Sequence, residues 1–490
     1  MMLSQLSGRM PMINLSHTVF RTRLLPITCA LMLAGCSTLA PDYSRSELPV
    51  PNEWDNQPSY ETQGLSDQQA MQVPWQSFIK EPRLVQVIEL ALSSNRSLRQ
   101  TLADVEAARA SYRIQKADLY PNLNAGLSGN RTKSSSGNIA TTYEAEAGLS
   151  GYEIDLFGKN RSLNTVQMEA YLASEETAKA TKITLIGEIA NAWLTLAADK
   201  NRLGLAQETA SNSQKTMEIT KKRLELGVDS RIDLASAETV YYNARSNIAS
   251  YTTQVAQDLN ALKLLVGEQF DDNLLPEALP ESESLVNDVP TGLSSEVLLQ
   301  RPDVLAAEHN LKSANANIGV ARAAFFPTLS LTATGGLASS VLADIFSGGA
   351  ISIWSIAPSL TLPIFDGGAN DANLDYSKAQ QTKYLAAYEY AIQSAFTEVA
   401  DALARRATIL QQLDAQEALV TAASRSYELS LARYKGGVDS FQNALEAQRT
   451  IYSARQSLIT TRLTDLDNRI TLYRVLGGGL AESKLLQSEG

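Results

Sequence analysis

Apolar residues recur at helical spacing along most of this chain. Residues 84–119 show this pattern without a Pro or Gly, and Pro121 ends the predicted helix. Residues 160–226 and 370–435 also lack Pro, and each predicts a helix about 100 Å long at 1.5 Å per residue. Helices of globular proteins usually have roughly 8–20 residues, so we expect these two to pack side by side along their length.

Each long helical pattern is followed by a short turn and a second helical pattern. The turns are 227–230 and 436–440, and the returning helices are 231–266 and 441–476. We expect each returning helix to lie antiparallel to the long helix before it. Gly at the end of a long helix fits a residue with positive φ, and Ser before the next helix fits an N-cap.

Apolar and polar residues alternate between the helical segments, as is typical of strands. The first predicted strand pair is 122–134 and 141–157, and the second is 328–337 and 351–365. The apolar phase shifts near Gly151, which predicts a bulge or bend there.

Strands of this length fit those of outer-membrane proteins. Four strands cannot close a barrel, because the smallest closed barrels have about eight. If these strands span a membrane, the protein must oligomerise, and a cyclic oligomer is the simplest closure. The alternative is a small soluble β-layer on a helical bundle.

The two halves of the chain repeat one plan. Glu188-Ile189-Ala190-Asn191-Ala192 matches Glu398-Val399-Ala400-Asp401-Ala402, and Gly227-Val228-Asp229-Ser230 matches Gly437-Val438-Asp439-Ser440, both 210 residues later. Tyr120-Pro121-Asn122-Leu123 matches Phe326-Pro327-Thr328-Leu329 at 206, and Leu156-Phe157 matches Ile364-Phe365 at 208. The matches predict a duplicated domain of roughly 200 residues, far longer than a solenoid repeat. The predicted organisation is a first repeat over 84–267, a linker over 268–293, a second repeat over 294–478 and a tail over 479–490.

The N-terminus has the pattern of an export signal. Arg21 and Arg23 precede an apolar run that ends Leu33-Ala34-Gly35-Cys36, too short for a spanning helix. It resembles a bacterial lipobox, which makes 1–35 a lipoprotein signal peptide and Cys36 the lipid-bearing first mature residue. The residue after Cys36 is Ser37 and not Asp, which in lipoproteins of this type implies the outer membrane. The alternative is an ordinary signal peptide with a chance Cys.

Composition and charge exclude several function classes. The chain has 490 residues with a net charge of −11, which argues against a broad basic surface for nucleic acid. Only two His and two Cys occur, and removal of 1–35 leaves one of each, so a Cys/His metal site is not expected. Dinucleotide, P-loop and nucleophile-elbow motifs are absent from the sequence. We therefore expect neither an enzyme nor a cofactor, and interpret His309 as a structural or surface residue.

At this point the chain resembles the TolC-like outer-membrane efflux factors, in the lipid-anchored subgroup that serves tripartite pumps of the resistance-nodulation-division type. The resemblance covers essentially the whole mature chain. Its marks are the lipobox, Pro121 and Pro327 at helix-to-strand junctions, Gly292-Leu293-Ser294-Ser295 running to Arg301-Pro302-Asp303, Tyr434 before the second turn, and the ending Leu476-Gly477-Gly478-Gly479.

The resemblance implies a mainly α fold with a transmembrane β part. Such proteins are homotrimers with a 12-stranded outer-membrane β-barrel continuous with a long periplasmic α-helical barrel. Residues 36–83 would form the lipidated N-terminal segment and, with 268–293, an equatorial region. The implied partners are a periplasmic adaptor (membrane fusion) protein, an inner-membrane transporter and outer-membrane lipid.

The implied function is a passive duct that carries solutes from the adaptor and transporter to the exterior, with a gated periplasmic end. The alternatives are a structural periplasmic coiled-coil lipoprotein without a pore, or the outer-membrane duct of a protein secretion system. Drugs, solvents, bile salts and metal ions all stay open as substrates, because selection in such pumps lies mainly in the inner-membrane partner.

The resemblance also implies site residues near the two turns. Tyr434 and Asp233 would link the inner and outer helix pairs and hold the periplasmic end shut. Asn443 and Glu446 align with the acidic rings of the tunnel constriction, although only Glu446 is acidic here. Asp439 stands where some relatives have an Arg that braces the closed state, which puts that brace in doubt. The adaptor-docking tip comprises Gly227, Val228, Ser230, Gly437, Val438 and Ser440.

Overall fold

A computed structural model of the chain describes residues 38–54, 74–286 and 294–478. The predicted signal peptide 1–35, Cys36 and the tail 479–490 lie outside the described residues. Part of the predicted linker, 287–293, does so as well.

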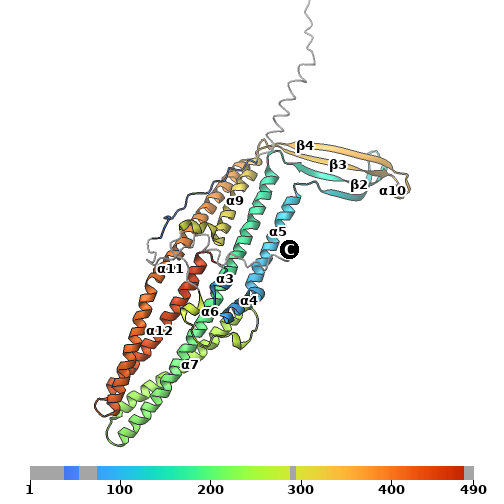
Figure 1. Cartoon of the computed structure of the whole chain (residues 1–490). Coiled ribbons are helices and arrows are strands. Elements are labelled where there is room, and N and C mark those ends of the chain that lie inside the picture. Colours follow the sequence, from blue (N-terminus) through green and yellow to red (C-terminus); the bar gives the residue numbers. More distant parts are fainter. Residues whose placement is uncertain (1–37, 55–73, 287–293, 479–490) are drawn as a thin grey trace, which may run out of the picture. The chain divides into compact units, whose positions relative to one another are not determined.

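Four long helices, in two consecutive pairs, make up about half of the described chain (Figure 1). Helix α6 (Lys159–Glu225) is followed by α7 (Arg231–Val266), and α11 (Ala369–Lys435) is followed by α12 (Phe441–Val475). The two long helices, α6 and α11, have 67 residues each. Among the described residues, no helix combines the length and the apolar character needed to cross a bilayer.

The segment predicted as one helix over 84–119 is two helices. Helix α4 (Pro82–Ser94) ends at Asn95, and α5 (Arg96–Ala117) begins after it. Asn95 is extended and buried, its side-chain oxygen accepts from Leu98 N at 2.8 Å, and its amide donates to Leu265 O at 2.6 Å. The break was missed because hydrophobic spacing continues across a polar residue that caps the second helix.

Short elements connect the long ones. They are α3 (Trp75–Phe78), the 3-10 helices η1 (Asp272–Leu274) and η2 (Ser295–Gln300), α8 (Ser282–Leu285), α9 (Pro302–Ala323) and α10 (Asp344–Ser347). Arg301 joins η2 to α9 and is largely buried. Its guanidinium contacts the Asp303 and Glu398 carboxylates at 2.7 and 2.9 Å and the Val475 carbonyl at 2.8 Å. The Arg301-Pro302-Asp303 motif therefore ties the start of α9 to α11 and α12.

The strands form one antiparallel sheet in the order β1–β2–β3–β4. The strands are β1 (Leu123–Lys133), β2 (Ile139–Ile154), β3 (Thr328–Ser339) and β4 (Ile351–Thr361). The predicted bulge is confirmed, because the β2–β3 register shifts between Leu149 and Tyr152, and Gly151 has φ +65°. Strands β1 and β4 are the two edges, and apolar side chains such as Trp354 on β4 are exposed.

The compact units of the structure cut across the predicted repeats. Among the described residues, one unit comprises 38–44, 110–169 and 312–382, and the other comprises 45–54, 74–109, 170–286, 294–311 and 383–478. Each unit therefore contains parts of both predicted repeats. The physical reason is that β2 of the first repeat pairs with β3 of the second over most of their length, so both repeats share one sheet.

In the sheet-containing unit, the first described residues lie against α9. Asn315 donates to the Pro41 carbonyl at 2.7 Å, and Arg322 donates to the Leu39 carbonyl at 3.0 Å. Gly319 allows this approach, since an added Cβ would lie 2.7 Å from the backbone nitrogen of Ala40.

The other unit has an apolar core where short elements pack on long helices. Leu84 and Ile88 of α4, Trp193 of α6 and Leu262 of α7 are all fully buried in it. Phe78 stacks on Tyr473 with ring centroids 4.0 Å apart.

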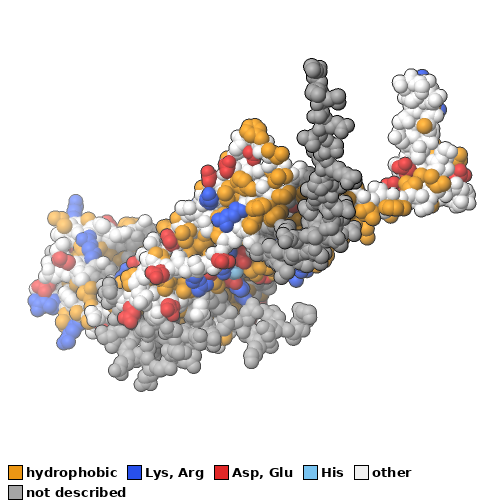
Figure 2. Space-filling view, turned by 90° about the horizontal axis from the view of Figure 1, so that it is seen from above, with side chains coloured by type: hydrophobic (Ala, Val, Ile, Leu, Met, Phe, Trp, Pro, Cys, Tyr) orange, Lys and Arg blue, Asp and Glu red, His pale blue; other side chains and the backbone are white. Residues whose placement is uncertain are grey.

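On the face shown in Figure 2, acidic and basic side chains are interspersed over the helices.

Candidate functional site: the two interhelical turns

The turns after α6 and α11 have the same backbone geometry. Gly227 and Gly437 have φ of +74° and +71°. Val228 N donates to Arg223 O at 2.9 Å, and Val438 N donates to Arg433 O at 3.0 Å. This is the Schellman pattern, in which a left-handed Gly closes a helix and satisfies its last carbonyls.

The two returning helices begin differently. Ser230 and Asp233 form a reciprocal capping box, with Asp233 N to Ser230 Oγ at 3.1 Å and Ser230 N to Asp233 Oδ2 at 2.9 Å. Ser440 occupies the N-cap position of α12, but its side chain makes no capping hydrogen bond. Both serines therefore stand at the predicted N-cap position, and only Ser230 makes the capping hydrogen bond. Asn443 replaces the acid that completes the first box.

Tyr434, in the last turn of α11, is the centre of a buried polar cluster. Its side chain is 1% exposed, and its hydroxyl donates to Asp229 Oδ2 at 2.5 Å and lies 2.9 Å from Thr220 Oγ1. The Arg223 guanidinium lies over the Tyr434 ring at 4.8 Å and contacts both Asp229 oxygens at 3.1 Å. The cluster therefore links α11 of the second repeat to the first repeat's turn and to α6.

Apolar neighbours keep water from this cluster. Tyr434, Phe441 and Leu445 form a small core with Ala237 and Ala444. Burial, followed by the hydrogen bond to the Asp229 carboxylate, raises the pKa of Tyr434 to about 12. A raised tyrosine pKa favours the protonated phenol, so the hydroxyl keeps its hydrogen at all pH values below about 10. The link is thus present across the whole neutral range.

The structure gives Tyr434 a partner other than the predicted Asp233. The Asp233 carboxylate oxygen Oδ2 instead accepts from Ser230 N at 2.9 Å and Ser230 Oγ at 2.6 Å. Asp229 lies four residues earlier and makes the contact instead. The role of Tyr434 and Asp233 in a gate stays a prediction, with Asp229 added to it.

The corresponding turn of the second repeat is more open. Arg433 Nε contacts Asp439 Oδ2 at 2.5 Å, with the two side chains 57% and 28% exposed. Arg433 lowers the pKa of the Asp439 carboxyl. Asp439 therefore has a local partner of its own, which parallels Arg223 and Asp229 without a buried phenol.

Asn443 and Glu446 are exposed on α12, while Ala444, Leu445 and Ala447 between and beside them are buried. The two polar residues are three apart, so they share one helix face. The exposed Val228 and Val438 lie at the tips of the two turns, at 61% and 65% exposure.

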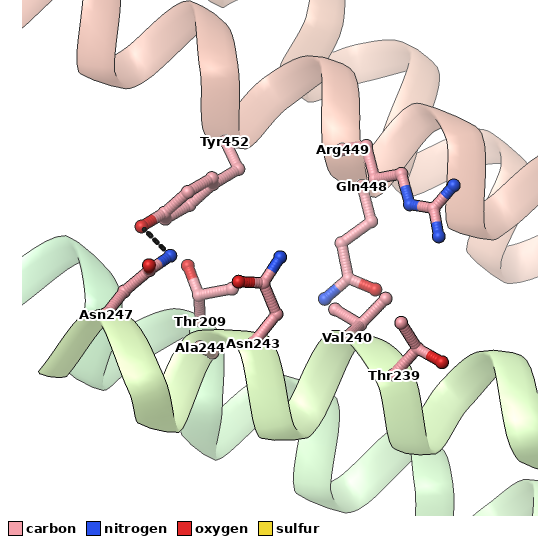
Figure 3. Close-up of a pocket in the computed structure, with 9 residues that line it drawn as sticks. All are labelled: Thr209, Thr239, Val240, Asn243, Ala244, Asn247, Gln448, Arg449 and Tyr452. Atoms are coloured by element: carbon pink, nitrogen blue, oxygen red, sulfur yellow. Dashed lines mark hydrogen bonds between the residues drawn. The ribbon is translucent and has the colours of Figure 1, made fainter. Parts of the chain in front are cut away.

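Polar contacts continue along the helices beyond the Tyr434 cluster. Asn247 donates to Tyr452 OH at 3.0 Å, Gln456 donates to Tyr251 OH at 2.9 Å, and Gln448 donates to Ser213 Oγ at 3.0 Å. Beside them lies a small pocket of about 60 Å³ between α6, α7 and α12 (Figure 3). It is lined by the amide and hydroxyl side chains of Thr209, Thr239, Asn243, Asn247, Gln448 and Tyr452 together with Val240, Ala244 and Arg449.

Three residues of the Tyr434 cluster escaped the sequence analysis: Thr220, Arg223 and Asp229. A usable pattern was present, because Arg and Asp recur six residues apart at both turns, as Arg223/Asp229 and Arg433/Asp439. Within the described residues, no group of three or more His, Cys, Asp or Glu is placed to hold a metal ion.

Comparison with known proteins shows which family this chain belongs to. The family described as outer membrane efflux protein matches residues 87–268 and 293–478, which are the two repeats. The chain belongs to this family. The channel is thus an outer-membrane component of an efflux pump, in a family of TolC-like channels of tripartite pumps.

Relatives extend over nearly the whole chain. The channel is 42% identical to the probable efflux pump outer membrane protein TtgC of Pseudomonas putida, over 92% of this chain and 94% of that protein. It is 39% identical to the outer membrane protein OprJ of Pseudomonas aeruginosa, over 93% and 96%. The solved open state of the MtrE outer membrane channel of Neisseria gonorrhoeae is 36% identical, with a TM-score of 0.83 over 91% of this chain and 100% of that one.

These relatives fix the broad role of the channel. It resides in the outer membrane and extends into the periplasm, and it works with an adaptor and an inner-membrane transporter. Its part in the pump is transport and not catalysis. Its fold is the mostly helical fold of this family, with a smaller strand part.

Proposed function

We propose that the channel is a homotrimeric, gated duct whose periplasmic end is held shut by the Tyr434–Asp229–Arg223 cluster. The single observation that carries the proposal is the 2.5 Å contact between the buried Tyr434 hydroxyl and the Asp229 carboxylate. It joins the end of α11 to the turn that follows α6. Separation of the two helical hairpins would require this contact to break.

Three copies account for the edges of the sheet. Strands β1 and β4 each have 11 residues, which suits tilted membrane strands of roughly 9–11 residues. Each also has an open hydrogen-bonding edge that hydrocarbon does not tolerate. Pairing of β4 with β1 of the next subunit satisfies both edges, and three copies give a 12-stranded barrel continuous with an α-helical periplasmic barrel.

The strength of the contact suits a gate. A hydrogen bond to a charged group contributes about 1.5–3 kcal/mol, and burial favours the upper part of that range. Because about 1.4 kcal/mol is a factor of ten, one latch biases the closed state by roughly 10- to 150-fold. An adaptor that binds the open state more tightly than the closed state, by a similar free energy, would open the latch.

The surrounding residues take the roles that the family implies. The exposed face of α12 that holds Asn443 and Glu446 would line the constriction, with a ring of three Glu446 carboxylates and a neutral layer of Asn443. The tip residues Gly227, Val228, Ser230, Gly437, Val438 and Ser440 would meet the adaptor. Cys36 would carry the lipid, two residues before the segment that lies against α9.

The names of relatives indicate the class of substrate. One relative is called an antibiotic efflux pump protein, and others are called toluene and solvent efflux pump proteins. We infer that this channel conducts small organic compounds of that kind, with selection made mainly by the inner-membrane transporter.

The test is single-channel conductance of the purified protein in planar bilayers. Tyr434→Phe removes only the phenol hydrogen bond, and Asp229→Ala removes its acceptor. Both variants should raise the conductance or the open fraction at neutral pH. Asp233→Ala is the matched control, because it removes a nearby carboxylate whose two contacts reach Ser230.

Two results would contradict the proposal in different ways. If Tyr434→Phe and Asp229→Ala conduct like the wild type, the latch assignment fails while the duct stands. If Asp233→Ala opens the channel and the other two variants do not, Asp233 and not Asp229 holds the closed state, as the family resemblance implies. Absence of any channel current from correctly folded wild type would favour a structural lipoprotein.

A further inference from the structure

The junction between the sheet and the helices contains an aromatic stack that joins the two repeats. Phe157 and Phe326 stack with ring centroids 4.6 Å apart and planes inclined by 24°. Phe157 follows β2, and Phe326 precedes β3. Three residues further into the sheet, Ile154 of β2 pairs with Leu329 of β3. Stack and strand pair therefore belong to one junction between the first repeat and the second.

The duplication provides a counterpart for each residue of this junction. Phe157 corresponds to Phe365, 208 residues later, and Phe326 corresponds to Tyr120, 206 residues earlier. These counterparts are exposed in the single chain, Phe365 at 92% and Tyr120 at 64%.

The strand pair beside the stack has counterparts of the same kind. Ile154 corresponds to Leu362, and Leu329 corresponds to Leu123, at the same two offsets. Leu362 and Leu123 are 51% and 79% exposed. They lie at the open edges of the sheet, Leu123 in β1 and Leu362 just after β4. One chain thus carries both halves of a second junction and leaves them unjoined.

We propose that Phe365 of one subunit stacks on Tyr120 of the partner subunit, with Leu362 placed opposite Leu123 of the partner subunit. The inference rests on the proposed trimer and names the residues that set its register. Three chains would then form a ring of six similar junctions, in which Phe157–Phe326 stacks within chains alternate with Phe365–Tyr120 stacks between them.

Chemistry favours a second copy as the occupant of these surfaces. The contact is already made once within the chain, so its geometry is compatible with this backbone. Aromatic side chains are large apolar groups whose burial is strongly favourable, and a tyrosine hydroxyl suits a position with one wet side. The exposed strand edges next to them need a partner with free backbone groups, which another copy offers and lipid does not.

Cysteine cross-linking of the full-length channel tests the proposal. The double variant Tyr120→Cys with Phe365→Cys should give covalently linked dimers and trimers under mild oxidation. The matched control is Phe157→Cys with Phe326→Cys, which occupies the equivalent junction inside one chain and should oxidise without linking chains. Each single-cysteine variant should show neither linking between chains nor oxidation within a chain. The single variants also control for reaction of the introduced cysteine with another cysteine of the protein.

Native mass measurement of the same samples tests the trimer separately from the Phe365–Tyr120 junction. A trimer in which only the Phe157→Cys/Phe326→Cys variant oxidises would overturn the junction and leave the trimer intact. Linked chains from the single variants at the level of the double variant would also overturn it. A wild-type channel that is monomeric in its membrane would overturn the proposed trimer itself.

Discussion

At the scale of single residues, the duplication allows one repeat to serve as a reference for the other. Asp465 of α12 is fully buried and contacts Arg406 at 2.9 Å, Arg469 at 3.3 Å and Ser282 of α8 at 2.5 Å. In the first repeat, the positions of Arg406, Asp465 and Arg469 are occupied by Leu196, Val255 and Leu259, 210 residues earlier. Those three residues belong to the apolar core or pack against it. The same three positions are thus occupied by an ion cluster in the second repeat and by apolar side chains in the first.

This comparison predicts how stability responds to mutation. Asp465→Ala should destabilise the channel by about 3–5 kcal/mol, because it removes a fully buried carboxylate that contacts two buried arginines. The triple change Arg406→Leu, Asp465→Val and Arg469→Leu should cost much less, since it copies the first repeat. Urea unfolding followed by helical circular dichroism measures both. Equal losses from the two variants would mean that the ion cluster has no apolar equivalent here.

The choice among neighbouring carboxylates marks where sequence reasoning ends. The family resemblance implies that Tyr434 links the helix pairs, and in the structure its hydroxyl contacts Asp229 in the turn after α6. The resemblance implied Asp233 as the partner of Tyr434, whereas Asp229 lies four residues earlier in the chain. The capping box with Ser230 uses Asp233, and only the three-dimensional turn shows that Asp229 points at the phenol. Spacing alone cannot decide between them.

At the scale of elements, hydrophobic periodicity predicted the long helices better than it predicted where helices begin. Patterns over 160–226 and 370–435 correspond to α6 and α11, observed at Lys159–Glu225 and Ala369–Lys435. The break at Asn95 was invisible, because it depends on hydrogen bonds to Leu98 and Leu265. Helix interiors follow from side-chain spacing, whereas ends follow from polar contacts that can lie far apart in sequence.

The second turn offers a test of docking at the level of an element. Gly437→Trp should abolish export in cells that contain the cognate adaptor and transporter, while a folded channel stays in the membrane. Gly437→Ala is the matched control. Both substitutions strain the backbone at φ +71°, and an added Cβ meets nothing within 4 Å, so they differ mainly in bulk that faces outward.

Drug or solvent tolerance of those cells and trypsin resistance of the isolated channel are the two measurements. Tolerance should be lost with Trp and largely kept with Ala, at equal trypsin resistance. Wild-type tolerance with Gly437→Trp would remove this turn from the docking surface. Loss with both substitutions would assign the effect to backbone strain.

At the scale of the whole molecule, the sequence predicted two copies of one plan but not how they combine. The repeats do not fold as separate bodies, because β2 and β3 pair over Tyr143–Leu149 and Tyr152–Ile154 of β2. The residue pattern of neither strand indicates which strand it pairs with. The pairing of repeats within the chain was therefore beyond the sequence, although the duplication itself was readable from four matched motifs.

The last prediction concerns charge in the assembled duct. A net charge of −11 per chain favours cations over the whole surface. The constriction should nevertheless dominate ion selectivity, because salt screens exposed charges beyond about 10 Å at 0.1 M. Glu446→Gln would remove three carboxylates from one ring, so cation selectivity and block by divalent cations should both weaken. Asn443→Asp would add a second ring on the same helix face and should strengthen both. Reversal potentials in asymmetric salt measure the selectivity of each variant. Opposite shifts from the two variants would place this face of α12 in the pore, whereas unchanged reversal potentials in both would place it outside the conducting path.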